Sequence, residues 1–314
     1  MNITILGLDQ WGYNKYVATA LEENGHTVRY INYHKLKYKY PGVIQKTGNF
    51  VTKTLFNYNF KRVHLEKALI ALLDKAKQQD RIIVIKGDEL SLNTLKFLKT
   101  KTDRLIAFFN DSITRYPRLK KIAPLFDKVY SFDPEDVAGH DYELLTNYIY
   151  FDPSKKSSKK TKYNIFNISS ISQRGNQINN FAQYFQKNEI DYKILALGPR
   201  QEEDGLLEYI DEPLPLNKVL NSYVSKSRIL LDIQRKGQVG LSFRVFEAIA
   251  LNKKLITTNT TIVDYPFYDA RNILVVDPHH IIIPKTFVDQ PYTPLAQPTV
   301  DQYLVTNWCQ ALLN

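Results

Sequence analysis

Residues 237–259, GQVGLSFRVFEAIALNKKLITTN, decide how the rest of the chain is interpreted. The stretch begins with a polar loop in which Gly237 and Gly240 allow the backbone to turn sharply. A short helix is expected next, and Arg244 and Glu247 share one face of it because they are three residues apart. A basic pair then leads into an apolar β-strand that ends in TTN.

This order of elements is typical of a site for a nucleoside diphosphate. The free N–H groups at the start of a helix bind phosphate. A carboxylate one turn further along, here Glu247, can accept hydrogen bonds from ribose hydroxyls. The sequence also leaves a plainer interpretation open, in which Glu247 is a solvated helix glutamate and Arg244 an ordinary surface arginine.

The same stretch resembles a known family of enzymes. EAIALNKKLITT, which starts at Glu247, is similar to the EAMACGKPVVAT-type segment of two-domain GT-B glycosyltransferases. A closer resemblance is to bacterial capsule and lipopolysaccharide glycosyltransferases of the CgeB-like kind. It rests on FDKVYSFDPEDV (residues 126–137), on LLDIQ from Leu230 and on GLSFRVFEA from Gly240, which follow one another in the same order.

In this family the glutamate typically holds the ribose of a nucleotide-sugar, and the preceding loop binds its diphosphate. The resemblance therefore implies an α/β GT-B fold, with two Rossmann-like domains whose parallel sheets face a central cleft. It also implies a glycosyltransferase that moves a sugar from a UDP- or GDP-linked donor to a glycan or lipid-linked glycan. That acceptor would be a growing cell-surface glycan such as capsule, exopolysaccharide or lipopolysaccharide.

Two other classes of protein compete with this interpretation. A Rossmann oxidoreductase requires a glycine fingerprint, which Gly7 and Gly12 do not form. A non-catalytic nucleotide- or polyanion-binding protein would need no general base, and it remains the alternative.

Length and composition fit a two-domain protein of the reduced cytoplasm. The 314 residues suffice for two cores, and no apolar run approaches the roughly 20 residues of a membrane span. The start, MNITILGLDQWG, lacks the basic segment of a signal peptide, so a cytoplasmic location is expected. The lone Cys309 excludes internal disulfides and cysteine-based zinc sites. No HExxH or well-placed DxD motif occurs, so we expect no cofactor and no metal.

The net charge of +10 is concentrated in residues 29–62. No acidic residue lies between Glu23 and Glu66. The basic residues there, interleaved with tyrosines and phenylalanines, are Arg29, Lys35, Lys37, Lys39, Lys46, Lys53, Lys61 and Arg62. Such a segment suits peripheral contact with an anionic inner membrane face, or it is a solvated excursion whose aromatic residues cover the core. No nucleic acid partner is expected, because no recognised binding motif is present.

Strands and helices are predicted to alternate in two blocks. Before the linker the predicted strands are Asn2–Leu8, Thr27–Asn32, Arg81–Lys86, Leu105–Phe109 and Lys128–Phe132, and the helices are Tyr13–Asn24, Val63–Gln78 and Leu92–Lys99. After it, Tyr163–Ile168, Tyr192–Leu197, Arg228–Ile233, Lys254–Thr258 and Asn272–Val276 are predicted strands, with helices ending at Gln186 and covering Leu216–Ser225 and 243–251. Such alternation favours parallel sheets with ligands at the carboxyl ends of the strands.

The linker Asp152–Lys162, DPSKKSSKKTK, cannot form core and marks a domain boundary. We therefore predict an acceptor-binding Rossmann-like domain at residues 1–152 and a nucleotide-sugar-binding one at 163–283. The tail at 284–314 is predicted to return to the first domain through a helix at Val300–Leu313.

Donor-binding candidates come from the quoted stretch and from the strand ends of the second domain. They are Gln238, Gly240, Leu241, Ser242, Arg244, Glu247, Asn259, Ser170, Arg174 and Gly198. Arg244 is the leading phosphate partner, because a guanidinium can form two parallel hydrogen bonds to phosphate oxygens. Arg174 and Ser170 follow the first strand of the second domain, and Gly198 permits close approach of a ligand; an ordinary surface arginine and a plain turn are the competing explanations.

For the catalytic base we favour Asp111 and Asp9, which follow apolar strands of the first domain. Each is equally compatible with an Asx turn or a helix N-cap. Asp88 and Glu89 are weaker candidates. Retaining GT-B enzymes commonly carry a second glutamate eight residues before the ribose glutamate. Here that position is Val239, with Gln238 beside it, so a retaining mechanism is in doubt.

Overall fold

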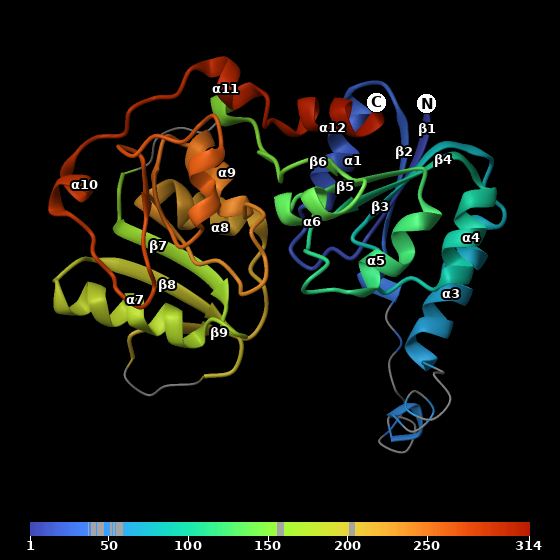
Figure 1. Ribbon diagram of the computed structural model, residues 1–314, viewed down its shortest axis with the longest axis horizontal. Helices are drawn as coiled ribbons and strands as arrows, with labels where there is room; N and C mark the ends of the chain where they lie inside the picture. The colour runs from blue at the N-terminus through green and yellow to red at the C-terminus, as the bar shows by residue number, and fades with distance from the viewer. Residues whose placement is uncertain are drawn as a thin grey trace.

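The structure, a computed structural model, describes residues 1–36, 38, 42, 47–50, 52, 54, 59–155, 160–200 and 205–314. It consists of two lobes, each built around its own sheet, and the end of the chain returns from the second lobe to the first (Figure 1). Both sheets are parallel at every described strand pair.

The first sheet has the strand order β2-β1-β3-β4-β5-β6. Its strands are β1 (Asn2–Gly7), β2 (Thr27–Asn32), β3 (Gln79–Ile85), β4 (Thr102–Phe109), β5 (Lys128–Ser131) and β6 (Glu143–Leu144). The helices of this lobe are α1 (Asn14–Glu23), α3 (Phe60–Leu73), α4 (Leu92–Thr100), α5 (Arg118–Ile122) and α6 (Pro134–Gly139). The apolar runs of β1, β3 and β4 are buried, as expected for strands covered on both faces.

The second sheet has the order β12-β11-β10-β7-β8-β9. Its strands are β7 (Tyr163–Ser170), β8 (Tyr192–Leu197), β9 (Glu208–Ile210), β10 (Ser227–Asp232), β11 (Lys254–Thr257) and β12 (Ile273–Val275). The helices of this lobe are α7 (Gly175–Lys187), α8 (Leu216–Ser222) and α9 (Phe243–Ala250). In each sheet the chain reverses its direction of winding at one point, between β1 and β3 and between β7 and β10. Ligands of open α/β sheets bind at such points.

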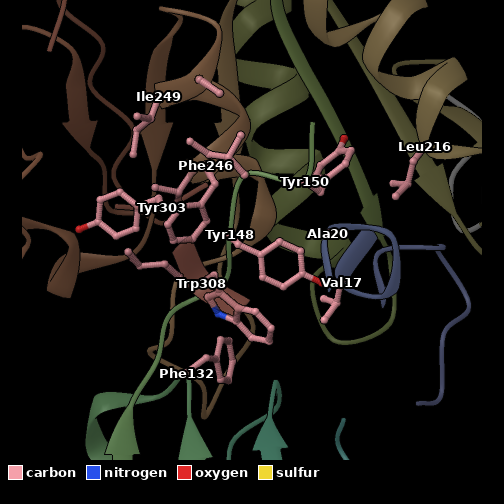
Figure 2. Packing of buried hydrophobic residues seen from close by; sticks show 14 of the residues in the cluster. Val17, Ala20, Phe132, Tyr148, Tyr150, Leu216, Phe246, Ile249, Tyr303 and Trp308 are labelled. Atoms are coloured by element: carbon pink, nitrogen blue, oxygen red, sulfur yellow. The ribbon is translucent and has the colours of Figure 1, made fainter. Parts of the chain in front are cut away.

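The tail contains α10 (Lys285–Asp289), α11 (Gln297–Asp301) and α12 (Val305–Leu313), and α12 packs on α1 of the first lobe (Figure 1). Trp308 Nε1 donates to the Thr146 carbonyl at 2.8 Å, which fixes α12. Trp308 and Tyr148 meet in an aromatic cluster that also contains Tyr150 and Phe246 (Figure 2).

The single helix predicted at Val300–Leu313 is therefore wrong, because the helix is interrupted before α12. Tyr303 and Leu304 pair instead with the segment before the linker: Ile149 N–H donates to the Tyr303 carbonyl at 2.7 Å, and Val305 N–H donates to the Ile149 carbonyl at 3.0 Å. These hydrogen bonds replace the helical ones and join the tail to the first lobe.

Two helices of the first lobe begin at side-chain caps. The helix α6 begins at Pro134, because the Asp133 side chain caps it by accepting from Glu135 N–H and proline suits the first position of a helix. The helix predicted at Val63–Gln78 is α3, which starts earlier because the Asn59 side chain caps it. It ends earlier because the chain must turn before β3 begins.

The lobes are joined by contacts between the segment after β5 and the loop before α9. The Asp133 carboxylate accepts from Val239 N–H at 3.0 Å and from Gly240 N–H at 3.3 Å. A Cβ on Gly240 would lie 2.7 Å from the Phe132 ring and from the Phe132 carbonyl oxygen, so only glycine permits this approach. Ser112 Oγ adds a 2.6 Å hydrogen bond to the Gly237 carbonyl.

In the part of the chain that the structure describes, no helix is long and apolar enough to cross a membrane. Much of the basic segment 29–62, including Lys37, Lys39, Lys46 and Lys53, lies outside the described residues, as do 156–159 of the linker. The membrane contact predicted for residues 29–62 therefore stays a prediction.

Candidate active site in the cleft between the sheets

A cleft of about 530 Å³ lies where the carboxyl ends of both sheets meet. The first sheet contributes Asp9 after β1, Lys86 and Asp88 after β3, and Asp111 after β4. The second sheet contributes the ends of β7 and β10 and the loop before α9. Both reversal points thus open on the same cleft, which is the position expected for a ligand.

Four arginines line this cleft, and three of them, Arg115, Arg174 and Arg235, lie close enough to affect one another's pKa. Arg174 precedes α7 and Arg235 follows β10, so both lie at the reversal point of the second sheet, while Arg115 comes from the loop after β4. Burial lowers the pKa of Arg174 to about 10, and the charge of Arg235 adds to this effect. Burial also lowers the pKa of Arg235, with Arg115 as the next cause. The guanidinium groups therefore repel one another across the cleft.

The hydrogen bonds of these arginines are few. Arg174 donates to two carbonyl groups, those of Ile233 at 2.7 Å and Ser170 at 3.2 Å, and Arg115 pairs with Asp111 at 2.7 Å. Among the described residues Arg235 forms no ion pair. Partly buried cations that repel one another, of which only Arg115 has a carboxylate partner here, are stabilised by an anion.

Residues that line the cleft also carry buried polar atoms without a hydrogen-bond partner. Within the described part of the chain they are Asn14 Nδ2, Asp88 Oδ1, Asn110 Oδ1, Asn147 Oδ1, Asn167 Oδ1, Gln234 Nε2 and Gln238 Oε1. Buried polar groups in native proteins are almost always hydrogen-bonded. A concentration of unpaired amide groups around one cleft therefore marks a place where water or a polar ligand supplies the missing hydrogen bonds.

Arg244 and Glu247 share a face of α9, as predicted, and form a buried ion pair. Burial opposes the charge of Arg244, but the Glu247 carboxylate beside it raises the pKa of the guanidinium. The second carboxylate oxygen of Glu247 accepts from Tyr150 Oη at 2.7 Å. Arg244 lines the cleft, whereas Glu247, only 1% exposed, is not among the lining residues. Its contact with ribose stays a prediction, and the structure gives it a role in holding Arg244.

The backbone N–H groups of the loop before α9 are not free for a phosphate, as its sequence suggests, but are hydrogen-bonded within the protein. The N–H groups of Val239 and Gly240, in the loop predicted to bind diphosphate, donate to Asp133. Ser242 caps α9, because its Oγ accepts from Arg244 N–H at 3.1 Å, and it also donates to Asp232 at 2.7 Å. Gln238, Gly240 and Ser242 line the cleft.

The other donor-binding candidates are spread over the second lobe. Ser170, Arg174 and Asn259 line the cleft, and Asn259 Nδ2 supports the loop by donating to the Val239 carbonyl at 2.8 Å. Leu241 is fully buried in the core and Gly198 packs against Ile171, so neither lines the cleft. Their predicted contacts with the donor have no support in the geometry.

The Asp9 carboxylate is occupied by structural hydrogen bonds. It accepts from the N–H groups of Gly12 at 2.6 Å, Tyr13 at 3.1 Å and Asn14 at 2.9 Å, and from Tyr30 Oη at 2.9 Å. Both carboxylate oxygens of Asp9 are therefore occupied, each by two hydrogen bonds. The Asp9 side chain therefore holds the turn that leads into α1, whereas a role in catalysis remains a prediction.

Asp111 belongs to a cluster of charges after β3 and β4. One of its oxygens is 2.9 Å from Lys86 Nζ and the other is 2.7 Å from Arg115. Lys86 Nζ also lies 3.9 Å from Asp88 and 3.7 Å from the centre of the Tyr116 ring. Both oxygens of Asp111 are thus paired with cations, while Asp88 is only loosely paired.

Sequence reasoning missed Arg115 and Arg235. Arg235 directly follows the LLDIQ segment, whose strand was predicted, and the rule that ligands bind after strand ends could have found it. Arg115 lies six residues beyond Phe109, the expected end of its strand, and nothing in the sequence places it opposite Arg174. Within the described residues no group of three or more His, Cys, Asp or Glu side chains could hold a metal ion. Metal independence stays a prediction.

No protein-family model matches this sequence, and no curated protein matches it. Solved structures do match. The Anabaena protein HepE in complex with UDP and glucose is 11% identical, with a TM-score of 0.59, covering 100% of this chain and 98% of that chain. The UDP-GlcNAc 2-epimerase of Neisseria meningitidis bound to UDP-GlcNAc is 10% identical, with a TM-score of 0.54 and coverage of 100% and 98%.

The α,α-trehalose 6-phosphate synthase of Burkholderia multivorans is 11% identical, with a TM-score of 0.52, covering 99% of this chain and 95% of that chain. Such similarity, together with the two parallel sheets around one cleft, settles the architecture. The chain has the GT-B fold. The predicted α/β class, with two Rossmann-like sheets facing a central cleft, is thus confirmed, whereas identities this low carry no activity over to this GT-B chain.

Proposed function

We propose that this GT-B protein is a glycosyltransferase that uses a nucleoside-diphosphate sugar, UDP- or GDP-linked, as its donor. The observation that carries the proposal is the group of arginines in the cleft: Arg174 and Arg235 at the reversal point of the second sheet, with Arg115 from the loop after β4 of the first. A donor diphosphate would neutralise charges that repel one another in the protein alone. As the bond between the sugar and the diphosphate of the donor breaks, negative charge grows on the departing diphosphate, and fixed guanidinium groups stabilise that charge.

The polar atoms around the cleft support a sugar on that diphosphate. Gln238 and Gln234 lie in the same lobe as Arg174 and Arg235, and each has a buried amide atom without a partner in the described part of the chain. Sugar hydroxyls both donate and accept, so they can pair with amide oxygens and nitrogens alike. Arg244, held by Glu247, completes the wall of the cleft on this side.

The finer parts of the proposal rest on the sequence. A CgeB-like enzyme of capsule or lipopolysaccharide synthesis would place the acceptor on residues 1–152 and the donor on 163–283. The acceptor would then be a glycan or lipid-linked glycan, with residues 29–62 facing an anionic membrane. A bilayer contact of this kind weakens with salt over a Debye length of about 8 Å at physiological ionic strength.

Calorimetric titration with UDP, GDP, CMP and NAD tests the donor site. We expect UDP or GDP to bind and NAD not to bind. Arg235→Ala should weaken nucleotide binding roughly tenfold to a hundredfold, because a charge-assisted hydrogen bond contributes about 1.5–3 kcal/mol. Lys236→Ala is the matched control: the neighbouring side chain has the same charge but is exposed and does not line the cleft.

The remaining outcomes separate the competing functions. Binding of nucleic acid or NAD alone, or equal loss of affinity in Arg235→Ala and Lys236→Ala, contradicts the proposal. Binding of a nucleoside diphosphate without any turnover of UDP-glucose, UDP-GlcNAc or GDP-mannose identifies a non-catalytic nucleotide-binding protein. Conversion of UDP-GlcNAc into its 2-epimer with no acceptor present identifies an epimerase.

A further inference from the structure

The carboxylate of Asp88 has features that set it apart from the other acids of the cleft. Two successive residues with positive φ, Lys86 at 72° and Gly87 at 82°, end β3 and turn the chain sharply just before Asp88. A left-handed conformation is uncommon for lysine and costs about 1 kcal/mol or more. The turn is therefore built into the site, and it places both Lys86 and Asp88 on the cleft wall.

The hydrogen bonding of Asp88 leaves its carboxylate available. Oδ1 is buried and has no hydrogen-bond partner in the described part of the chain, and the Lys86 ammonium, 3.9 Å away, is beyond hydrogen-bond distance. The side chain as a whole is 14% exposed, so Oδ2 is the oxygen left to meet a ligand. Asp9 accepts four hydrogen bonds and Asp111 is held by two cations, so neither is free in this way.

We propose that Asp88 is the general base that activates the acceptor hydroxyl in an inverting transfer. This rests on the proposed function and assigns the step to one residue of the first sheet, facing the arginines of the second. Asp111 and Lys86 are positioning residues: Asp111 holds the Lys86 ammonium at 2.9 Å, and that ammonium stands beside Asp88.

The step balances without any other reactant. The acceptor oxygen forms a bond to the anomeric carbon of the donor sugar while the bond from that carbon to the phosphate oxygen breaks. The electron pair of the broken bond leaves on the nucleoside diphosphate, whose negative charge the arginines stabilise. The acceptor proton passes to Oδ2 of Asp88 and then to solvent. Glycoside, nucleoside diphosphate and one proton are the products.

The electrostatics agree with this role. Burial raises the pKa of Asp88, the Lys86 charge opposes the rise, and Glu89 and Asp111 add to it. A carboxylate with a raised pKa binds a proton more readily, and general bases work best when their pKa lies closer to the working pH. The same charges predict a loss of activity as pH falls through the raised pKa, because the protonated carboxyl cannot accept a proton.

The decisive experiment compares Asp88→Asn with Glu89→Gln. Glu89 is the neighbouring carboxylate on the same cleft wall. UDP affinity is measured by calorimetry, and release of UDP from UDP-glucose, UDP-GlcNAc and UDP-galactose is measured with water and with simple methyl glycosides as acceptors. We expect Asp88→Asn to keep UDP affinity within about twofold. Turnover at saturating donor should fall by roughly a hundredfold or more, which is the usual contribution of a general base to the rate.

In Glu89→Gln the acid limb of the pH profile should move to lower pH, because a like charge beside Asp88 is removed. Glu135→Gln, which changes an exposed carboxylate that does not line the cleft, should keep the wild-type rate. Turnover of Asp88→Asn close to that of the wild type would overturn the assignment, and so would retention of anomeric configuration in the wild-type product. Failure of the wild type to bind or turn over any nucleoside-diphosphate sugar would instead contradict the proposed function itself.

Discussion

The ion pair between Arg244 and Glu247 allows a sharp test of whether α9 serves stability, donor binding or both. Glu247→Leu removes the carboxylate and leaves the guanidinium of Arg244, which is only 9% exposed, without its ionic partner. Removing one partner of a buried pair typically costs about 3–5 kcal/mol. The hydroxyl of Tyr150 also loses its acceptor, so we expect the upper part of this range.

Arg244→Met should behave differently, because a buried carboxyl can accept a proton. At pH 7, protonating a group whose ordinary pKa is 4.5 costs about 3 kcal/mol, at about 1.4 kcal/mol per pH unit. In this variant the pKa of Glu247 lies above its unfolded value, so the folded state binds more protons and stability falls as pH rises. The cost should therefore disappear as pH falls towards 4.5. For Glu247→Leu no such recovery is expected, since guanidinium stays charged.

The double variant separates structure from function. Replacing a buried ion pair by apolar residues of similar volume is often neutral or stabilising by about 1–4 kcal/mol. Arg244→Met with Glu247→Leu should thus regain most of the lost free energy of unfolding, measured by urea denaturation at pH 5 and pH 7. If the pair also contacts the donor, UDP affinity measured by calorimetry stays weak in this stable variant. Glu247→Leu with wild-type stability would refute the reasoning.

The remaining predictions concern the contacts between the lobes, the buried thiol and the role of metal. Gly240→Ala should lower the free energy of unfolding by about 1–3 kcal/mol, because its Cβ would lie 2.7 Å from Phe132; Gly139→Ala, with nothing within 4 Å, is the control and should be close to neutral in the same urea titration. Cys309 should resist a thiol reagent such as DTNB at pH 8 in the native protein, since burial raises its pKa to about 12, and rapid labelling would show that α12 is not held as described. Turnover of a UDP-sugar should be unchanged in EDTA, and recovery of lost activity by added Mg²⁺ or Mn²⁺ would contradict metal independence.

The sheets could be predicted from sequence because their signal is local. Runs such as Ile82–Ile85 are apolar and β-branched throughout, as is typical of strands buried on both faces. The predicted strand at Tyr192–Leu197 agrees with β8 at both ends, and β3, β4, β7 and β10 were found with their ends shifted by a few residues. The short edge strands β6 and β9 have two and three residues, too few to produce a periodic pattern.

The features that could not be predicted depend on contacts between distant segments. The break before α12 exists because Tyr303 pairs with Ile149, which the helical pattern of the tail cannot reveal. The loop N–H groups of Val239 and Gly240 suit a phosphate by sequence, yet Asp133, more than a hundred residues away, accepts their hydrogen bonds. A motif identifies which groups are able to bind, and the tertiary structure decides what they bind.

The arrangement of charge across the cleft follows from the same topology. Each sheet brings its reversal point to the cleft. Every acid that lines the cleft except Asp232 follows a strand of the first sheet, whereas Arg174 and Arg235 lie at the reversal point of the second. A transfer reaction requires this separation, because a base must accept a proton on one side while charge develops on a leaving group on the other. Mixing the two sets would pair carboxylates with guanidiniums and remove both functions. Asp111 and Arg115, which both belong to the first lobe, do pair with each other at 2.7 Å. That pairing leaves Asp88 and Arg235 as the groups free to act on a substrate.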